Sequence, residues 1–296
     1  MKFSDLLELL LLGAVWGASF MLMRTTVPEF GVFALVEVRA VLAFLFLMPF
    51  VILSKQLRDM RTHWKGLLVV GALNTAVPFC LFAYSSLHLD AGLNSILNGT
   101  APMFGAIVAV LYLKEAISKV AMFGLFLGFF GVLVISQQTK GNAALSVLPI
   151  VAALSATACY GMAACYLKKH LASVKPFAIA AGSQLFAGIL ILPLALTTWP
   201  SASISTDAWL NASLLAVMCT GFAYVMYFRL IANVGASNAL TVAYLVPLFG
   251  ILWGVVILDE TLSLQSIMGG VLIILGVMFT TGLFSRIAKN LIRART

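Results

Sequence analysis

Residues 91–132 and residues 236–277 repeat one another in register, with a constant offset of 145 positions and no gap. The matched pairs in this repeat include Pro102 and Pro247, Glu115 and Glu260, Gly124 and Gly269, and Gly131 and Gly276. A fixed register over such a length indicates an internal duplication, and an internal repeat dictates the architecture of the fold that contains it.

The duplication extends toward the N-terminus of each copy. Thr75 pairs with Thr220 at the same offset, whereas Trp16 pairs with Tyr160 at an offset of 144, because one residue is inserted between about 50 and 74. The sequence therefore predicts two homologous units, residues 1–143 and residues 144–296.

Composition places both units in a lipid bilayer. The chain is 62% hydrophobic and only 9% charged, whereas a soluble domain carries roughly 25% charged residues. Its apolar runs are about 20 residues long, which suits a helix that crosses a hydrocarbon core of ~30 Å. The lipid bilayer is therefore an expected partner, and the net charge of +8 is interpreted as cytoplasmic loop charge rather than as a nucleic-acid surface.

The predicted fold is an all-α integral membrane protein with ten transmembrane helices. We expect these helices at about residues 6–23, 32–54, 65–87, 92–113, 119–137, 146–167, 176–198, 209–231, 237–258 and 264–285. Five helices per unit is an odd number, so the second unit enters the membrane in the opposite sense. Such inverted repeats are typical of carriers that work by alternating access around a site near the midplane.

Loop charges set the expected orientation. With the N-terminus inside, 15 Lys and Arg residues fall in inner segments and only Arg24 and Lys140 fall in outer segments, with Arg39 set aside inside a helix. Because Lys and Arg concentrate in cytoplasmic loops, both termini are predicted to face the cytoplasm. The inner segments include the C-terminal tail with Arg286, Lys289, Arg293 and Arg295.

The order of these features resembles a known family. Trp16-Gly17 in the first helix, the Arg39 region in the second, Pro102 followed by Glu115, and Pro247 followed by Glu260 carry the resemblance. Together they resemble the drug/metabolite transporter superfamily, and within it the EamA-type ten-helix exporters. The resemblance implies a multi-pass protein of the cytoplasmic (inner) membrane that transports small metabolites, often outward, with amino acids as the commonest class.

Arg39 and Glu37 are the two unambiguous charges inside a predicted span, and intramembrane charges are functional candidates by default. They are two positions apart, so they point to different sides of the helix and cannot pair well. Arg39 is open to two interpretations: it binds a substrate carboxylate, or it binds carbonyl groups of a neighbouring helix.

Uncharged polar and aromatic side chains at mid-depth complete the predicted substrate site. An amide or hydroxyl in hydrocarbon needs a partner, which is either another helix or a ligand in a wet cavity. Both alternatives stay open for Asn94 and Asn98, which share a helix face, and Asn98 is the one nearer the midplane. The predicted substrate-binding residues are Trp16, Arg39, Asn74, Thr75, Asn98, Tyr160, Thr220, Tyr224 and Tyr244.

Pro102 and Pro247 are the predicted hinges of the carrier. Each proline removes a backbone N–H donor near the centre of its span and leaves the carbonyl group four residues earlier without its helical partner. These carbonyl groups belong to Asn98 for Pro102 and to Ala243 for Pro247. The result is either a static bend or a moving one.

A glycine pattern at residues 124, 131, 269 and 276 predicts close contact between the fifth and tenth helices.

These features favour a carrier for a small neutral or zwitterionic molecule, without cofactor or metal, acting as a monomer or weak homodimer. A nucleotide sugar is the second substrate class, because its phosphates need several buried bases and the spans offer only Arg39. The rival classes are an integral-membrane enzyme and a non-transporting scaffold. An enzyme is disfavoured, because the three histidines lie at span ends and lack a nucleophile and base within reach.

Overall fold

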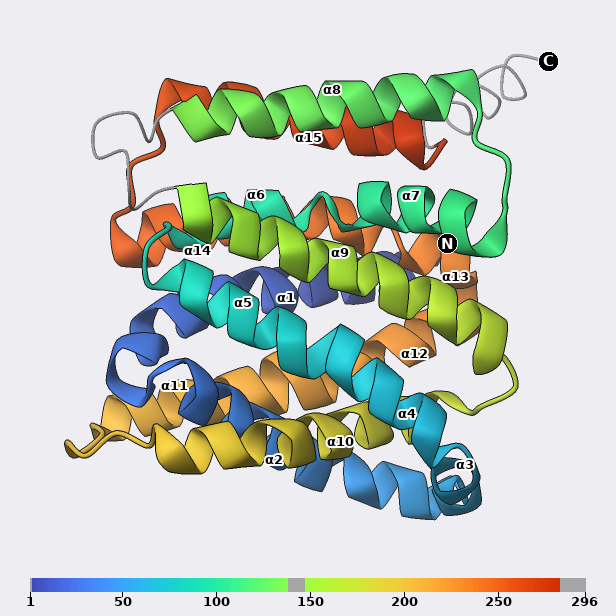
Figure 1. The fold of residues 1–296 in the computed structure, drawn as a ribbon, viewed down its shortest axis with the longest axis vertical. Coiled ribbons are helices and arrows are strands. Elements are labelled where there is room, and N and C mark those ends of the chain that lie inside the picture. Colours follow the sequence, from blue (N-terminus) through green and yellow to red (C-terminus); the bar gives the residue numbers. More distant parts are fainter. Residues whose placement is uncertain (1, 138–146, 283–296) are drawn as a thin grey trace.

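The protein is described by a computed structural model that covers residues 2–137 and 147–282. In these two ranges the regular elements are helices, and they lie side by side as a bundle of long rods (Figure 1). Within the described residues, eight helices are long and apolar enough to cross a membrane, and Val242–Leu258 and Leu264–Thr280 are shorter apolar helices. Lys140 and the basic tail, to which the sequence analysis assigned sides, lie outside the described residues.

The elements of the first unit follow the predicted spans, but the third and fourth spans are divided and the short helix α3 precedes the third. They are α1 (Phe3–Phe30), α2 (Val32–Leu53), α3 (Leu57–Thr62), α4 (Trp64–Val70), η1 (Gly71–Ala76), α5 (Val77–Ser86), α6 (Ala91–Asn98), α7 (Ala101–Leu113) and α8 (Lys119–Ser136). The first helix runs seven residues beyond its predicted end at 23, because Gly31, with φ of +73°, is the residue that ends it.

The elements of the second unit follow a similar order along the chain. They are α9 (Val147–His170), α10 (Pro176–Thr197), α11 (Thr206–Ala216), η3 (Val217–Phe222), α12 (Ala223–Val234), α13 (Ala236–Ala239), α14 (Val242–Leu258) and α15 (Leu264–Thr280). In Figure 1, α1 and α9 run in opposite directions across the molecule.

Equivalent positions of the two units end and begin helices in the same way. Lys114 and Asp259, 145 positions apart, both adopt the left-handed conformation that terminates α7 and α14. Ser118 and Ser263 then cap α8 and α15, each hydroxyl oxygen accepting a backbone N–H three residues later at 3.1 Å. The local chemistry of these links is therefore duplicated along with the helices.

Two helices contain a short π-helical segment, which the sequence analysis did not predict. The segment η1 interrupts the helix that runs from Trp64 to Ser86, and η3 interrupts the helix from Thr206 to Val234. They lie at matching places in the two units and carry Thr75 and Thr220 respectively. Segments of this kind are frequent at functional sites, because the extra residue per turn redirects side chains and frees backbone groups.

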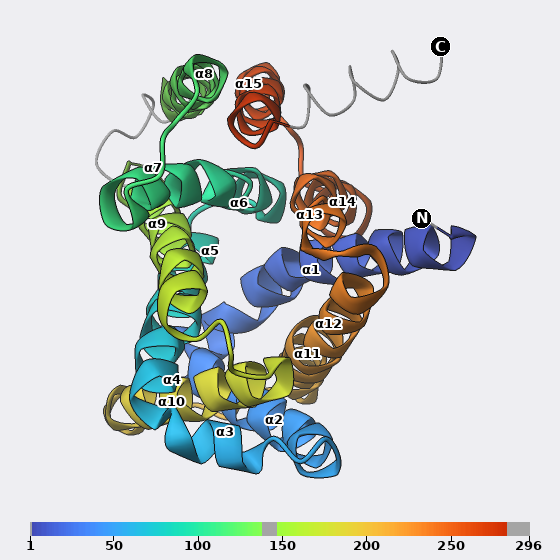
Figure 2. The ribbon, with the colours of Figure 1, turned by 90° about the vertical axis from the view of Figure 1, so that its right-hand side faces the viewer.

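Helix packing crosses between the two units throughout the bundle (Figure 2). α2 packs along α10, and α8 packs along α15 at the far end of the molecule. α1 packs on α14 in the same way that α9 packs on α7, so each unit's first helix contacts the other unit's fourth span. A core built this way holds the two units together as one body.

Glycines make the closest of these contacts. A Cβ atom on Gly276 would lie 2.6 Å from the carbonyl oxygen of Gly124, and one on Gly131 would lie 2.6 Å from the carbonyl oxygen of Gly269. The predicted close approach of the fifth and tenth helices is therefore confirmed. Gly17 meets Gly250 and Gly161 meets Gly105 in the same manner, at equivalent positions of the two units.

The two prolines differ from each other more than the sequence analysis expected. Pro102 lies in the first turn of α7, after the chain has already left the helix at Gly99 and Thr100, so it does not bend a continuous helix. Pro247 lies inside α14 as predicted. The two segments are in contact, because the hydroxyl group of Ser95 in α6 donates to the carbonyl oxygen of Pro247 at 3.4 Å.

Candidate functional site

Arg39 is the centre of the polar cluster in the membrane-spanning part of the molecule. Its side chain is only 6% exposed, and its Nε donates to the hydroxyl oxygen of Thr220 at 2.9 Å. Its guanidinium carbon lies 3.7 Å from the ring centroid of Phe79. The hydroxyl group of Thr220 in turn donates to the carbonyl oxygen of Leu215 at 3.1 Å, in a π-helical turn.

The edge of this guanidinium group that carries the two Nη atoms has no hydrogen-bond partner in the part of the chain that the structure describes. Among the described residues, neither Nη atom of Arg39 donates a hydrogen bond, and no carboxylate lies within 4 Å of the group. Two other side-chain atoms are fully buried without a hydrogen-bond partner among the described residues, but the Nη atoms of Arg39 do not belong to that group. Glu37, as expected from its spacing, does not neutralise Arg39. A buried guanidinium group thus presents its two-pronged edge without a counter-charge.

The other predicted hydrogen-bonding residues surround this cluster from both units. The amide nitrogen of Asn74 donates to the hydroxyl oxygen of Tyr224 at 3.1 Å. Tyr160 and Tyr224 lie close enough to Arg39 to interact with it electrostatically. The structure thus brings together Arg39, Asn74, Tyr160, Thr220 and Tyr224 of the predicted substrate-binding residues.

Thr75 is the symmetry counterpart of Thr220, and it faces a neutral partner. Gln184, one position beyond the repeat counterpart of Arg39, donates from its amide nitrogen to the hydroxyl oxygen of Thr75 at 3.4 Å. Both of these side chains are fully buried. One unit therefore holds a charged Arg39–Thr220 pair where the other holds a neutral pair, so the positive charge is a feature of one unit alone.

Aromatic rings occupy equivalent places on the two first helices. Trp16 packs on Tyr227 with ring centroids 5.3 Å apart, and Tyr160 packs on Phe82 at 6.1 Å. Residues 82 and 227 are themselves 145 positions apart. Trp16 and Tyr160 are half-buried, which leaves ring faces available to a flat or apolar part of a ligand.

The two asparagines of α6 have different environments. Asn94 is fully buried, and its amide donates to the carbonyl oxygen of Phe82 at 3.3 Å and to the hydroxyl oxygen of Ser86 at 2.9 Å. Asn94 thus joins α6 to α5. Asn98 is half-buried at the end of α6, and its side chain makes no hydrogen bond with the described residues. Only Asn98 is free to contact a ligand.

Tyr244 lies apart from the rest of the predicted site. It stands in the first turn of α14, and its hydroxyl group bonds to that of Thr281, just after the end of α15. It was expected beside Tyr224 because both tyrosines fall near mid-depth of their predicted spans. Because α14 begins only after the break at residues 240 and 241, Tyr244 lies in its first turn, beside Thr281.

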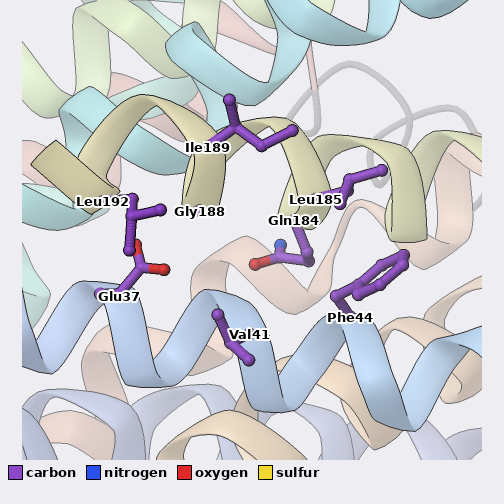
Figure 3. Close-up of a pocket in the computed structure, with 8 residues that line it drawn as sticks. All are labelled: Glu37, Val41, Phe44, Gln184, Leu185, Gly188, Ile189 and Leu192. Carbon is purple, nitrogen blue, oxygen red and sulfur yellow. The ribbon is translucent and has the colours of Figure 1, made fainter.

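A narrow crevice of about 140 Å³ lies between α2 and α10 (Figure 3). Glu37 and Gln184 point into it, and a carboxylate oxygen of the first and the amide oxygen of the second are buried without a hydrogen-bond partner among the described residues. The rest of its lining is apolar, and Val41 and Leu192 reach the outer surface of the bundle. Arg39 is not part of this lining.

Comparison with known proteins assigns this architecture. The model of the EamA-like transporter family matches residues 5–137 and again residues 147–282. The chain belongs to the EamA-like transporter family. It is accordingly a multi-pass integral membrane protein, in agreement with the resemblance inferred from its sequence.

Relatives of this EamA-like protein occur in bacteria and archaea. It is 25% identical to the uncharacterized transporter YoaV of Bacillus subtilis, over 92% of this chain and 94% of the relative. It is 28% identical to the protein PecM of Dickeya dadantii, over 93% and 92% of the two chains. An uncharacterized transporter of Archaeoglobus fulgidus is 22% identical over 88% and 93%.

One solved crystal structure has the same fold as this EamA-like chain. It superimposes with a TM-score of 0.68 at 16% identity, and covers 97% of this chain and 99% of its own. At that identity the likeness concerns the fold alone.

The sequence analysis missed two residues of the cluster, Phe79 and Phe82. Both are ordinary phenylalanines in an apolar run, so composition gives no reason to select them. The repeat offset does give one, because Phe79 corresponds to Tyr224 and Phe82 corresponds to Tyr227. The repeat register therefore identifies both phenylalanines, because each is the counterpart of a tyrosine in the other unit.

Proposed function

We propose that this EamA-like protein is a carrier that moves small polar metabolites across the membrane, with amino acids as its first substrate class and export as its net direction. The carboxylate of the substrate binds at the free edge of Arg39, and its uncharged or aromatic part contacts Trp16 and Tyr160. Ten spans in two inverted units rock around this site, and both termini face the cytoplasm. These units place their contacts in equivalent pairs, which supports the proposed symmetry.

The observation that carries the proposal is the buried, uncompensated guanidinium group of Arg39. Leaving a charge in a low-dielectric interior without a partner is costly, and an anionic ligand removes that cost. A guanidinium edge matches a carboxylate in shape and binds it through two parallel hydrogen bonds. Substrate binding therefore completes an interaction that the protein alone leaves unfinished.

A carboxylate suits this site better than a phosphate ester does. Arg39 is the one Lys or Arg side chain that is buried among the described residues. A nucleotide sugar, the second candidate class, carries several negative charges and needs more than one base. An amino acid carries one carboxylate, and its ammonium group contacts hydroxyl groups and ring faces.

Flux measurements in liposomes test this function. The purified protein is reconstituted into vesicles loaded with a panel of labelled amino acids, their amides and their decarboxylated amines. We expect the amino acids to leave the vesicles unchanged, and the amides and amines to stay. Chemical conversion of the label would indicate an enzyme. No movement of any amino acid, in a protein that remains folded, would contradict the proposal.

A further inference from the structure

Two ion pairs occupy equivalent positions at opposite ends of the molecule. One joins Arg24, near the end of α1, to Glu260 in the link between α14 and α15. The other joins Lys168, near the end of α9, to Glu115 in the link between α7 and α8. Arg24 and Lys168 differ by 144 positions, and Glu115 and Glu260 differ by 145. In Figure 1 the two links lie at opposite ends of the bundle.

The Glu260 end is tightly bonded in this conformation. The side chain of Glu260 is 6% exposed, and its two oxygens accept the first backbone N–H groups of α6, from Ala91 at 2.7 Å and Gly92 at 3.0 Å. This places a carboxylate on the positive end of a helix. The link after α14 is thereby fastened to the start of α6, which belongs to the other unit.

Arg24 fastens a third element to the same point. Its guanidinium group lies 3.3 Å from Glu260 and 3.0 Å from Asp90, and it donates to the carbonyl oxygen of Leu89 at 2.6 Å. The end of α1, the start of α6 and the link after α14 therefore meet in one bonded group of charges. Any opening of this end of the bundle separates them.

The Glu115 end has the same charges without the same burial. Lys168 lies 2.6 Å from Glu115, but their side chains are 64% and 46% exposed. Among the described residues, Glu115 has no other side-chain partner. Solvent screens such an exposed pair, so it contributes little to holding that end together.

We propose that Glu260 and Glu115 are alternating gate residues of the transport cycle. In the conformation seen here Glu260 is buried and bonded to α6, whereas Glu115 is exposed and bonded to Lys168 alone among the described side chains. When the two units rock, Glu260 leaves α6, and Glu115 with Lys168 takes the equivalent buried place at the other end. This inference rests on the proposed alternating-access function, and it assigns the gating to a pair of carboxylates rather than to the prolines.

Glu260→Gln and Glu115→Gln test the proposal, because each keeps the size of the side chain and removes its charge. Spin labels at His88 and Thr261 report the width of the Glu260 end, and labels at Ala116 and Asn233 report the other end. All four positions are exposed and the two label pairs are equivalent in the repeat. The labels are placed in a variant without the native cysteines, after its unfolding temperature is shown to match that of the wild type.

We expect the two variants to shift the ensemble in opposite senses, each by tenfold or more in the ratio of the two states. Glu260→Gln widens the His88–Thr261 distance and narrows the Ala116–Asn233 distance, and Glu115→Gln favours the conformation seen here. Glu29→Gln is the matched control, because Glu29, in the last turn of α1, accepts the backbone N–H of Ser205 and takes no part in the pair. The end of α1 and the link between α14 and α15 lie on the same side of the molecule in Figure 1. We expect Glu29→Gln to move neither distance.

Shifts of the same sense in both variants, or no shift in either, would overturn the gate. A shift in Glu29→Gln as large as that in Glu260→Gln would overturn it as well, since any lost charge would then have the same effect. These distances are measured without substrate. A carrier with normal flux and unmoved distances thus refutes the gate alone, whereas absent flux with opposite shifts refutes the proposed function alone.

Discussion

Thr220 orients the charge on which the proposed substrate site depends. Its hydroxyl oxygen accepts from Nε of Arg39, while the ring of Phe79 supports the flat face of the same group. The two Nη atoms are left to face a ligand. These two contacts fix the orientation of the Arg39 side chain before a ligand arrives. Binding therefore costs less conformational entropy of that side chain.

Thr220→Val keeps the shape of the side chain and removes the hydrogen bond to Arg39. A hydrogen bond to a charged group is worth about 1.5–3 kcal/mol, so the apparent KM for transport rises by roughly tenfold or more. Thr75→Val is the matched control, because its partner is the neutral Gln184. Equal changes in KM for the two variants, measured as initial flux rates, would show that Arg39 needs no such support.

Asn94 and Asn98 are expected to have different roles, the first structural and the second in ligand binding. Asn94→Leu leaves the buried groups of Phe82 and Ser86 without their partner, which costs about 1–3 kcal/mol each and lowers the unfolding temperature. Asn98→Leu breaks no hydrogen bond among the described residues, so we expect a folded protein that has lost transport. Wild-type flux in Asn98→Leu, with its unfolding temperature unchanged, would remove Asn98 from the site.

At the scale of elements, α8 and α15 form a close pair built on backbone contact. Gly276 faces Gly124 and Gly128 with no room for a side chain. Gly276→Val therefore forces the two helices apart and destabilises the protein by about 1–3 kcal/mol, the usual cost of overpacking. The matched variant is Gly105→Ala, whose added Cβ atom meets nothing within 4 Å. Thermal unfolding in detergent should show a loss of stability for the first variant only.

The sequence predicts the helices better than it predicts their interruptions. Long apolar runs fix where a span lies, because only a helix satisfies its own backbone in lipid. The π-helical turns η1 and η3 carry residues that make tertiary contacts, such as Thr220 with Arg39, and local composition carries no sign of them. The break before Pro102 is missed for a related reason: a proline marks an irregularity without telling on which side of it the chain leaves the helix.

The sequence likewise predicts some residues of the candidate site but not the contacts that they make. Buried charge and mid-span amides are visible in the sequence, so Arg39 and Asn98 could be selected. Which amide is satisfied by a neighbouring helix depends on packing, and only the structure separates Asn94 from Asn98. The displacement of Tyr244 toward Thr281 likewise depends on where α14 begins, a boundary that sequence gives only to within a few residues.

At the scale of the whole molecule, the repeat predicts that equivalent loops of the two units face opposite sides. The loop at Ser54 and the loop at Ala202 lie at opposite ends of the bundle in Figure 1, and both residues are exposed. Single cysteines at these two positions should react with an impermeant reagent from opposite sides, with Ser54 on the cytoplasmic side. Ala202 is chosen because nearby Ser205 caps α11. Labelling of both positions from one side would contradict the inverted arrangement.

The central claim is that one site, anchored by Arg39, is presented to each side of the membrane in turn. Counterflow in reconstituted vesicles tests it most directly: vesicles hold a high concentration of unlabelled amino acid, and a trace of the labelled form is added outside. A carrier that alternates accumulates label transiently above its equilibrium level, because returning sites are kept occupied from within. We predict this overshoot for the wild type and its loss in Arg39→Gln of equal unfolding temperature. Label that rises only to equilibrium in the wild type, or an overshoot that survives in Arg39→Gln, would contradict the account.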